Sequence, residues 1–563
     1  MHFSRLLFAG VVCLAVPTSQ AADPRSIRGL WLMGQSLCEG AESLPLVTTQ
    51  PSTSGALMFQ RGVRTWTYGD HHADPGKRPD SQFGFLPLRP AAIGGLGETM
   101  ANGLADHLQR AIGTREKRST PSFLVTYAGQ GGRTIGELSS ADEAPDPRTP
   151  DVKRKGGGYY KTSLDDARRA TKQARAQGGD FSIAALVWMQ GEANGGPTGG
   201  IVPHRWEAEM PRPAGQEWYS GQLIAYHRQW SKDLCQITGQ RGEIPMFTYQ
   251  TLGPAGEAQL MATDRDPNLY MVGPHYVVPS AINSLRDNGL HGASIHLSAD
   301  GERWFGEQVA KVIHRVTVEG EKWQPLRPRR AVIEPSRLSI LVEMHVPRPP
   351  LVLDEQFLPR AEVAIKDFFT VLDGFRVSSA TGAVPLLKKV DVATPTALRL
   401  HLAAPLPEKT PYQLSYGYSQ AGEIGTVASV QPGATAQGQP MSEIHIAGDL
   451  RARLKSLMDE GAFYVVNTAV GAEYAQTTVR SVQYEAGFTV LRFEDRDLRN
   501  KVPFVAGQQL VVLRPFPYGN VRDLDAEPSV YKFTDASYGT RAGQPYPLWN
   551  WCVSFSGFPV EEK

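Results

Sequence analysis

The sequence has few cysteines, and they indicate neither a disulfide framework nor a zinc site. Four cysteines occur in 563 residues, and Cys13 lies within an apolar N-terminal stretch. The other three, Cys38, Cys235 and Cys552, allow at most one disulfide within the chain. No Cys/His spacing resembles a zinc motif.

The sequence also lacks an excess charge and a long apolar run beyond its first residues. Its 58 Lys and Arg residues are balanced by 57 Asp and Glu residues, which leaves a net charge of +1. Such a chain has no long-range field to attract nucleic acid or an anionic membrane. No later run approaches the roughly 20 apolar residues that a membrane helix needs. We therefore expect no nucleic-acid partner and no membrane span.

The N-terminus has the three parts of a secretory signal peptide. A basic start ends at Arg5, residues 6–16 are apolar, and Ser19-Gln20-Ala21 offers small residues for cleavage. We expect residues 1–22 to be removed and the mature protein to be secreted or periplasmic.

The chain is too long for one hydrophobic core, and its pattern changes near residue 330. Before that point, strand-like and helix-like segments alternate. Strands are expected at 27–33, 123–127, 183–189 and 244–249, and helices at 104–113, 163–178, 219–237 and 304–316. This alternation predicts an α/β domain with a mostly parallel sheet and helices on both faces.

After the Pro-rich junction at 323–335, short β-type runs separated by turn residues dominate. They predict a β-sandwich of immunoglobulin-like character. The Gln-, Gly-, Pro- and Ala-rich stretch 428–441 is interpreted as a linker, and a second small β unit follows it. We expect a catalytic domain at 23–325, an accessory β-sandwich formed by 335–440 and 516–563, and a β-rich insertion at 441–515.

Ser36 and His296 are the candidate nucleophile and base. Ser36 follows the first predicted strand, and His296 precedes the last predicted helix. Reactive groups of parallel sheets gather beyond the carboxyl ends of the strands, so the two can converge. A serine hydroxyl becomes a useful nucleophile when an imidazole removes its proton and later returns it to the leaving group. Taken singly, Ser36 is better explained as a turn serine and His296 as a residue at the start of a helix. Together they favour the catalytic interpretation.

Four short blocks occur in order along residues 27–318: Gly34-Gln35-Ser36, Gly131-Gly132-Arg133-Thr134-Ile135, Trp188-Met189-Gln190-Gly191-Glu192 and His296-Leu297-Ser298-Ala299-Asp300-Gly301. Together they resemble the SGNH (GDSL-like) hydrolase superfamily, and within it the carbohydrate esterases similar to sialate O-acetylesterase. The resemblance implies a flavodoxin-like three-layer sandwich with a parallel sheet. It also implies an acyl-serine intermediate, no metal or organic cofactor, and an acetylated sialic acid or polysaccharide as substrate. The 349–354 and 546–552 segments resemble accessory β domains of such esterases.

The resemblance further implies roles for residues around Ser36. The oxyanion donors would be the backbone N–H of Ser36, an N–H of the Gly94-Gly95-Leu96-Gly97 turn, for which Gly97 is our choice, and the side-chain amide of Gln190. Asn194 is a less favoured substitute for Gln190. The candidate substrate-binding residues are Gln35, Arg133, Glu192 and Asn194. Glu192 is expected to hold Gln190 or Arg133 in place.

Arg133 has two interpretations. It either forms a salt bridge at the domain surface or clamps a substrate carboxylate, such as that of a sialic or uronic acid.

The residue that orients His296 is left open. Many members of the superfamily carry Asp three residues before the histidine, but Ala293 stands there. Asp287 is our first choice, with His291 or a backbone carbonyl as alternatives, the last giving a Ser-His dyad. The Asp70-His71-His72-Ala73-Asp74 stretch is interpreted as a solvated loop rather than a metal site.

Three functions remain open at this point. The first is an exported carbohydrate O-acetylesterase, and the second is a lipase or arylesterase of the same superfamily. The third is a non-catalytic glycan-binding surface protein whose esterase domain has decayed.

Overall fold

The structure is a computed structural model that describes residues 23–562. Within this range it leaves out 53–54, 67–77, 90–96, 116–120, 140–144, 147–148, 154–157, 197–199, 205–206, 279, 283–292, 358–361, 366–368, 380–383, 418–420, 435–439, 452–463, 468–475, 479–480, 495–504, 508, 514–517 and 535–541. The predicted signal peptide lies outside the described residues.

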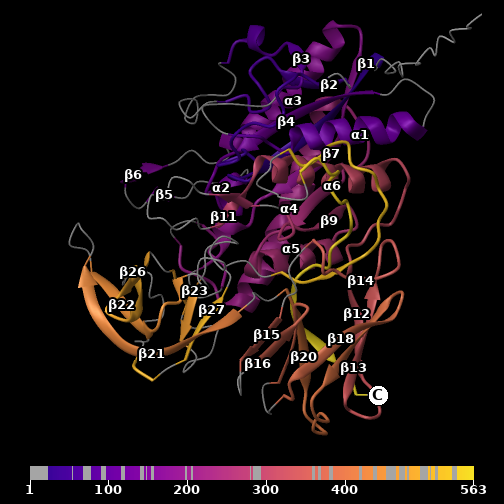
Figure 1. Cartoon of the computed structure of the whole chain (residues 1–563). Helices are drawn as coiled ribbons and strands as arrows, with labels where there is room; N and C mark the ends of the chain where they lie inside the picture. Colours follow the sequence, from indigo (N-terminus) through magenta and orange to yellow (C-terminus); the bar gives the residue numbers. More distant parts are fainter. Residues whose placement is uncertain are drawn as a thin grey trace, which may run out of the picture.

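A seven-stranded, mostly parallel sheet forms the centre of the N-terminal half, with the order β3-β2-β4-β1-β7-β8-β9 (Figure 1). The five main parallel strands are arranged 2-1-3-4-5 in chain order, as in flavodoxin-like doubly wound sheets. Only β2 and β3 pair antiparallel. The bounds are β1 Asp23–Gly34, β2 Ala56–Phe59, β3 Phe85–Pro87, β4 Pro121–Gly129, β7 Asp180–Met189, β8 Met246–Gln250 and β9 Leu269–Pro274.

Helices cover both faces of this sheet because β1 alternates its apolar side chains between two cores. Leu30 and Leu32 pack in the core that includes α1 and α6, whereas Trp31 and Met33 pack in the core that includes α3, α4 and α5. The result is the three-layer α/β arrangement expected from the sequence. The helices are α1 Ala101–Arg115, α3 Gly158–Ala176, α4 Arg212–Thr238, α5 Gly253–Arg265 and α6 Ala299–Thr317.

Smaller elements line the edge of the sheet where the parallel strands end. The short helix α2 spans Ile135–Leu138, and the 3-10 turn η4 spans Glu192–Asn194. A two-stranded ribbon pairs β10 (Ser280–Ile282) with β11 (Ala293–Leu297). The remaining elements of this half are η3 Asp80–Gln82, β5 Pro145–Asp146 and β6 Thr149–Lys153.

The expected helix start at Ser163 is wrong, because α3 begins at Gly158 and Ser163 lies inside it. The hydroxyl of Ser163 accepts a hydrogen bond from Trp230 Nε1. Asp166 bonds to Thr65 and Arg78 rather than to the backbone at a helix start. Both polar side chains therefore connect α3 to neighbouring segments, which a local capping pattern does not reveal.

The C-terminal half consists of antiparallel sheets, shown in the lower part of Figure 1. One sheet has the order β12-β13-β19-β18, a second has the order β15-β16-β17-β20-β29, and β14 pairs with β28. Their bounds are β12 Arg327–Ile333, β13 Ser339–His345, β14 Val352–Leu353, β15 Glu362–Ile365, β16 Phe369–Leu372, β17 Phe375–Ser378, β18 Leu387–Thr394, β19 Ala397–Leu402, β20 Tyr412–Tyr416, β28 Val521–Arg522 and β29 Phe555–Val560.

The stretch expected to be a linker, 428–441, instead belongs to a third, seven-stranded sheet. Its order is β24-β23-β27-β21-β22-β26-β25, and β21 pairs with both β22 and β27. The interpretation failed because pairing on both sides supplies the hydrogen bonds that a Gly- and Pro-containing strand could not retain alone. The strands are β21 Ala421–Ala434, β22 Pro440–Ala447, β23 Tyr464–Asn467, β24 Gln476–Thr478, β25 Ser481–Glu485, β26 Phe488–Glu494 and β27 Gln509–Leu513.

A long C-terminal segment returns from the antiparallel sheets to the α/β domain, and its described parts, 518–534 and 542–553, run along α6 (Figure 1). We call it the strap. Its contacts with α6 include Trp304 Nε1 donating to Pro547 O at 2.9 Å and Lys311 Nζ donating to Asn550 Oδ1 at 2.8 Å. The two halves of the molecule are therefore joined by more than the covalent junction near residue 325.

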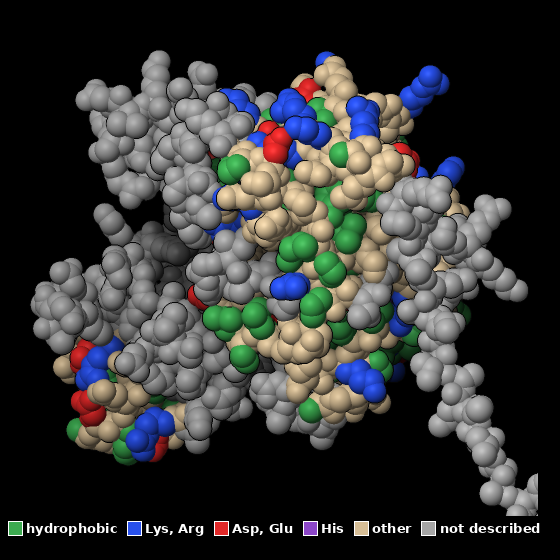
Figure 2. Space-filling view, turned by 90° about the horizontal axis from the view of Figure 1, so that it is seen from above, with side chains coloured by type: hydrophobic (Ala, Val, Ile, Leu, Met, Phe, Trp, Pro, Cys, Tyr) green, Lys and Arg blue, Asp and Glu red, His purple; other side chains and the backbone are tan. Residues whose placement is uncertain are grey.

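On the face shown in Figure 2, Lys and Arg side chains form separate groups with Asp and Glu side chains among them. This distribution agrees with the near-zero net charge. Within the described residues, no helix has the length and apolar character needed to cross a bilayer. Cys38, Cys235 and Cys552 are all free thiols.

The strap also places a buried histidine of α1 between two carboxylates. His107 Nδ1 lies 2.9 Å from Glu307 of α6, and its Nε2 lies 3.4 Å from Glu527 of the strap. Burial alone lowers the pKa of His107, but its interactions with Glu307 and Glu527 outweigh this effect and raise the pKa above its usual value.

This arrangement predicts a pH-dependent stability. A raised folded-state pKa means that the contribution is fully present below about pH 6.5 and is lost as the pH rises through the folded pKa. We expect the advantage of the wild type over His107→Gln in free energy of unfolding to shrink between pH 6 and pH 9, measured by urea denaturation. A constant or growing advantage would contradict the assignment.

Candidate active site

The adjacent parallel strands β1, β4 and β7 end in register, and glycines at the ends of β1 and β4 allow the backbones to approach closely. Gly34 at the end of β1 lies opposite Gly129 of β4 and Met189 of β7. A Cβ on Gly34 would lie 2.2 Å from Met189 O, and one on Gly129 would lie 2.1 Å from Gly34 O. The segments that follow β1, β4 and β7 therefore begin side by side, at the point where the strand order reverses.

Ser36 lies in the tight turn that follows β1. The N–H of Gln35 donates to Met189 O at 3.1 Å, which fixes the entry to the turn. The carbonyl of Ser36 accepts from the N–H groups of Glu39 and Ala41, both at 3.1 Å. No acceptor among the described residues bonds to the N–H of Ser36, so this donor is available for a substrate oxygen.

His296 of β11 reaches the nucleophile candidate directly. Its Nε2 lies 2.7 Å from Ser36 Oγ. Two residues later Ser298 begins α6 as its N-cap, accepting from the N–H of Gly301 at 3.1 Å. The two side chains that the sequence placed at opposite ends of the α/β domain are thus within proton-transfer distance.

The other ring nitrogen of His296 faces a residue that the sequence analysis missed. Glu42 Oε2 lies 3.1 Å from Nδ1. With Glu42 accepting from Nδ1–H, Nε2 is left as the acceptor for the Ser36 hydroxyl, which is the arrangement of a general base.

Glu42 adopts a left-handed backbone conformation, with φ of 65°. This conformation costs about 1 kcal/mol or more in a residue with a side chain, and such residues concentrate at functional sites. Neighbouring contacts hold the turn in place. Ser43 Oγ donates to Gly40 O at 2.6 Å or to Glu98 O at 2.8 Å, and the N–H of Glu98 donates to Ser43 O at 2.8 Å.

Gly97 supports this turn and does not serve as the expected oxyanion donor. Its N–H donates to Gly40 O at 2.8 Å, so the donor is already used. A Cβ on Gly97 would lie 2.0 Å from Ser43 O. The glycine is thus explained by the close approach of the turn that carries Glu42, and its position before a helix was a misleading signal.

Gln190 is fully buried beside Ser36 and is surrounded by acceptors. Its Nε2 bonds to Asn194 Oδ1 at 2.7 Å, to Arg133 O at 3.0 Å and to Gln35 Oε1 at 3.3 Å. The two amide hydrogens are therefore both used within the protein. Donation to an oxyanion would require one of these bonds to break, so the structure gives Gln190 a positioning role.

Gln35 and Asn194 share that role. Gln35 Oε1 accepts from the N–H of Ala193, and Asn194 Nδ2 donates to Val202 O at 2.7 Å. Asn194 Oδ1 also accepts from the N–H of Ile135 at the start of α2. Through these bonds the segments after β1, β4 and β7 hold one another in place.

Glu192 has different partners from those expected. Its carboxylate accepts from the hydroxyls of Tyr249 and Thr251, and no contact with Gln190 or Arg133 is observed among the described residues. The expectation that it holds Gln190 or Arg133 is therefore wrong. Tyr249 lies in β8 and Thr251 follows that strand, a partnership that spacing within one motif cannot reveal.

Arg133 forms the salt bridge that was one of its two interpretations. Its Nη1 donates to Glu137 Oε1 at 2.8 Å, and Nη2 donates to Gln130 Oε1 at 3.0 Å. Glu137 also closes a capping box with Thr134 at the start of α2. Although burial alone lowers the pKa of Arg133, Tyr159 and Glu137 raise it overall, so the guanidinium stays charged.

Gly131 lies against the nucleophile and is a donor that the sequence analysis did not select. A Cβ on Gly131 would lie 3.2 Å from Ser36 Cβ and 3.5 Å from Glu39 Oε2. Its N–H has no bonded acceptor among the described residues. The Gly131-Gly132 pair was visible in the sequence, but nothing there distinguished it from the Gly94–Gly97 turn.

Several sequence candidates lie outside the described residues. Asp287 and His291 fall within 283–292, and the Asp70-His71-His72-Ala73-Asp74 stretch falls within 67–77. In the part of the chain that is described, no three His, Cys, Asp or Glu side chains group as metal ligands would.

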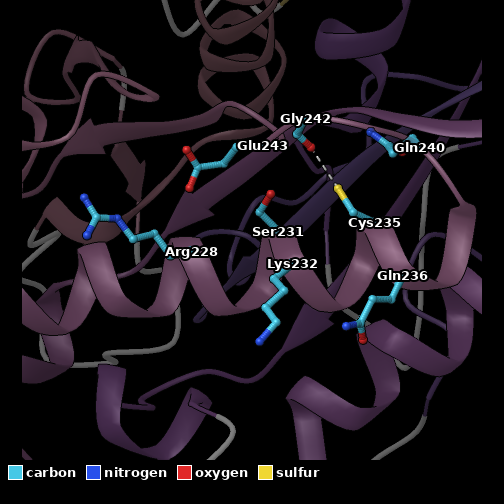
Figure 3. A pocket seen from close by; sticks show the side chains of 8 residues that line it. All are labelled: Arg228, Ser231, Lys232, Cys235, Gln236, Gln240, Gly242 and Glu243. Carbon is cyan, nitrogen blue, oxygen red and sulfur yellow. Dashed lines mark hydrogen bonds between the residues drawn. The ribbon is translucent and has the colours of Figure 1, made fainter.

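A surface hollow on α4 lies away from this site (Figure 3). It is bounded by Lys232 and Cys235 on the helix and by the turn at Gly242, whose carbonyl accepts from the Cys235 thiol at 3.0 Å. The adjacent Gln240 bonds to Ile183 near the start of β7. The hollow therefore lies near the amino ends of the strands, opposite Ser36.

Comparisons with known proteins give partial structural likenesses only. No family model and no curated protein sequence matches the chain. A carbohydrate acetylesterase from Xanthomonas citri aligns at 16% identity over 69% of this chain and 75% of that chain, with a TM-score of 0.40. NanS aligns at 16% identity over 53% and 99%, with a TM-score of 0.33. A protein from Arabidopsis thaliana aligns at 14% identity over 52% and 99%, with a TM-score of 0.32.

The geometry predicts that Glu42, and not Asp287, orients His296. We expect Glu42→Gln to slow phosphonylation of Ser36 by a fluorophosphonate roughly 10²- to 10⁴-fold, as loss of the acidic member does in serine triads. Mass spectrometry of the labelled peptide measures the rate. Asp287→Asn is the competing variant, and the assignment fails if Asp287→Asn slows labelling while Glu42→Gln does not.

Proposed function

We propose that this protein is a serine esterase that removes O-acetyl groups from a carbohydrate. One observation carries the proposal: Ser36 Oγ lies 2.7 Å from His296 Nε2, and Glu42 Oε2 lies 3.1 Å from Nδ1 of the same ring. A hydroxyl, an imidazole and a carboxylate in this order form the standard apparatus for acyl transfer.

The first half-reaction forms an acyl-enzyme. Ser36 Oγ attacks the acetyl carbonyl carbon while His296 Nε2 accepts the hydroxyl proton. Glu42 stabilises the positive charge that develops on the ring. The tetrahedral intermediate then collapses, the C–O bond to the sugar breaks, and His296 returns the proton to the leaving sugar hydroxyl. Acetyl-Ser36 and a free sugar alcohol result.

The second half-reaction releases acetate. His296 accepts a proton from a water molecule that attacks the acyl carbonyl, and it returns this proton to Ser36 Oγ as the ester bond breaks. The backbone N–H groups of Ser36 and Gly131 are our choice of oxyanion donors, because both lie at the nucleophile and neither has a bonded acceptor among the described residues. Each such donor contributes roughly 10²- to 10³-fold in rate.

The choice of substrate rests on the sequence. The ordered blocks around Ser36, Arg133, Gln190 and His296 resemble carbohydrate esterases, and the predicted signal peptide fits a substrate outside the cytoplasm. The alternative of a decayed esterase relied mainly on Ala293 standing in place of an aspartate. The position of Glu42 removes that support, because the ring has a carboxylate from another segment.

The proposal predicts that Ser36→Ala abolishes ester hydrolysis. We expect a loss of about 10⁴-fold or more with p-nitrophenyl acetate and with an acetylated glycan, since a residue that forms the covalent bond has no substitute. Wild-type activity should fall from acetate to octanoate esters of p-nitrophenol. Equal residual activity of the variant and the wild type would reject the mechanism, and a preference for octanoate would favour the lipase alternative.

Arg133 supplies a further prediction about the substrate. A guanidinium that exchanges its bond to Gln130 for one to a substrate carboxylate would bind an acetylated sialic acid. In that case Arg133→Met raises KM for this substrate about tenfold or more, as expected for the loss of a charged hydrogen bond. The KM for a neutral acetylated glycan should be unchanged, and steady-state kinetics with both substrates measures this. Equal effects on both would assign Arg133 to the salt bridge with Glu137 alone.

A further inference from the structure

The strap bonds to the first turn of α6, which begins three residues after His296. Asp300 is the second residue of that helix and is 2% exposed. Its Oδ2 accepts from both the N–H of Thr534, at 3.0 Å, and the hydroxyl of Thr534, at 2.8 Å. Its Oδ1 accepts from the hydroxyl of Tyr546. The catalytic histidine is thus followed, four residues later, by a carboxylate held from outside the α/β domain.

Arg303 extends this contact to the segment that follows Glu42. One face of its guanidinium lies 4.4 Å from the ring of Tyr531, and it donates to Tyr546 Oη at 2.9 Å and to Lys532 O at 3.2 Å. Its Nη1 lies 3.5 Å from Val47 O. One buried arginine of α6 therefore contacts both the strap and the 43–48 segment.

The 43–48 segment is held on its other side by Glu98. The carboxylate of Glu98 accepts from the N–H of Thr48 at 2.9 Å, and Ser43 Oγ lies 2.8 Å from Glu98 O. Glu42 therefore belongs to a turn whose next residues contact Glu98, just before α1, and Arg303, while His296 belongs to the strand that leads into α6. Both partners of the 3.1 Å contact depend on the same buried cluster.

We propose that Asp300, Arg303, Thr534 and Tyr546 form a clamp through which the strap positions His296 against Glu42 and Ser36. The proposal rests on the esterase function above and deepens it. These four are positioning residues, because none of them touches the reacting atoms. The antiparallel sheets thereby contribute to catalysis through the segment that they send back to α6.

Tyr546→Phe and Thr534→Val test the clamp with little change in volume. Each removes a hydroxyl that bonds to Asp300, and Val at 534 keeps the backbone donor. A displacement of the His296 imidazole by a few tenths of an ångström should lower kcat about five- to tenfold. This is less than the roughly 10²-fold loss of rate that a misplacement of 1 Å causes. KM should stay within twofold, because substrate contacts are untouched.

Ser529→Ala is the matched control. Its hydroxyl also belongs to the strap and bonds to a carboxylate of α6, Glu307, at 2.7 Å, but two turns farther from His296. We expect kcat to stay at the wild-type value although the melting temperature falls. The clamp is rejected if Tyr546→Phe and Thr534→Val also keep the wild-type kcat, or if all three variants lower kcat equally.

Hydrogen exchange separates this proposal from the esterase function. The amides of Gly301, Glu302 and Thr48 should exchange about five- to tenfold faster in Tyr546→Phe than in the wild type, since local opening is governed by local contacts. In Ser529→Ala their exchange rates should equal those of the wild type. Unchanged exchange in Tyr546→Phe would overturn the clamp whether or not the protein hydrolyses esters. Failure of the esterase proposal would instead appear as ester hydrolysis that survives in Ser36→Ala.

Discussion

The site depends on the absence of side chains where β1, β4 and β7 end. At Gly34 and Gly129, carbonyl oxygens of neighbouring strands occupy the space that a Cβ would take. Only this close approach lets the Ser36 turn, Gly131 and the Gln190 segment start from one point. A parallel sheet delivers reactive groups to this edge in any case, but glycine determines whether they meet within hydrogen-bonding distance or several ångströms apart.

Sequence patterns predicted the elements that are determined by residues close together in the chain. Apolar periodicity located α1, α4 and α6 and the central strands, and the order of short blocks paired Ser36 with His296. Glu42 was missed because it reaches the ring through a left-handed turn, and no spacing rule marks that geometry. The strand β21 was missed for a related reason, since its Gly- and Pro-containing sequence is stabilised by two partners distant along the chain.

The polar side chains around Ser36 mostly bond to one another or to nearby backbone groups. Gln35, Gln190 and Asn194 form a buried network with one another and with nearby backbone groups, and Glu192 accepts from the hydroxyls of Tyr249 in β8 and Thr251 after it. Such networks cost little when every member has a partner and rigidify the atoms around them. This rigidity fixes the directions of the backbone N–H groups of Ser36 and Gly131. Fixed directions fit the role of oxyanion donors that we propose for these two groups.

The position of the strap makes the order of synthesis matter. The ribosome completes α6 more than two hundred residues before it reaches Tyr546. The polar side chains of Asp300, Arg303 and Lys311 therefore remain hydrated until their partners in the strap have been synthesised. A nascent chain that lacks its last segment thus also lacks Thr534 and Tyr546, the residues through which we propose that the strap positions His296.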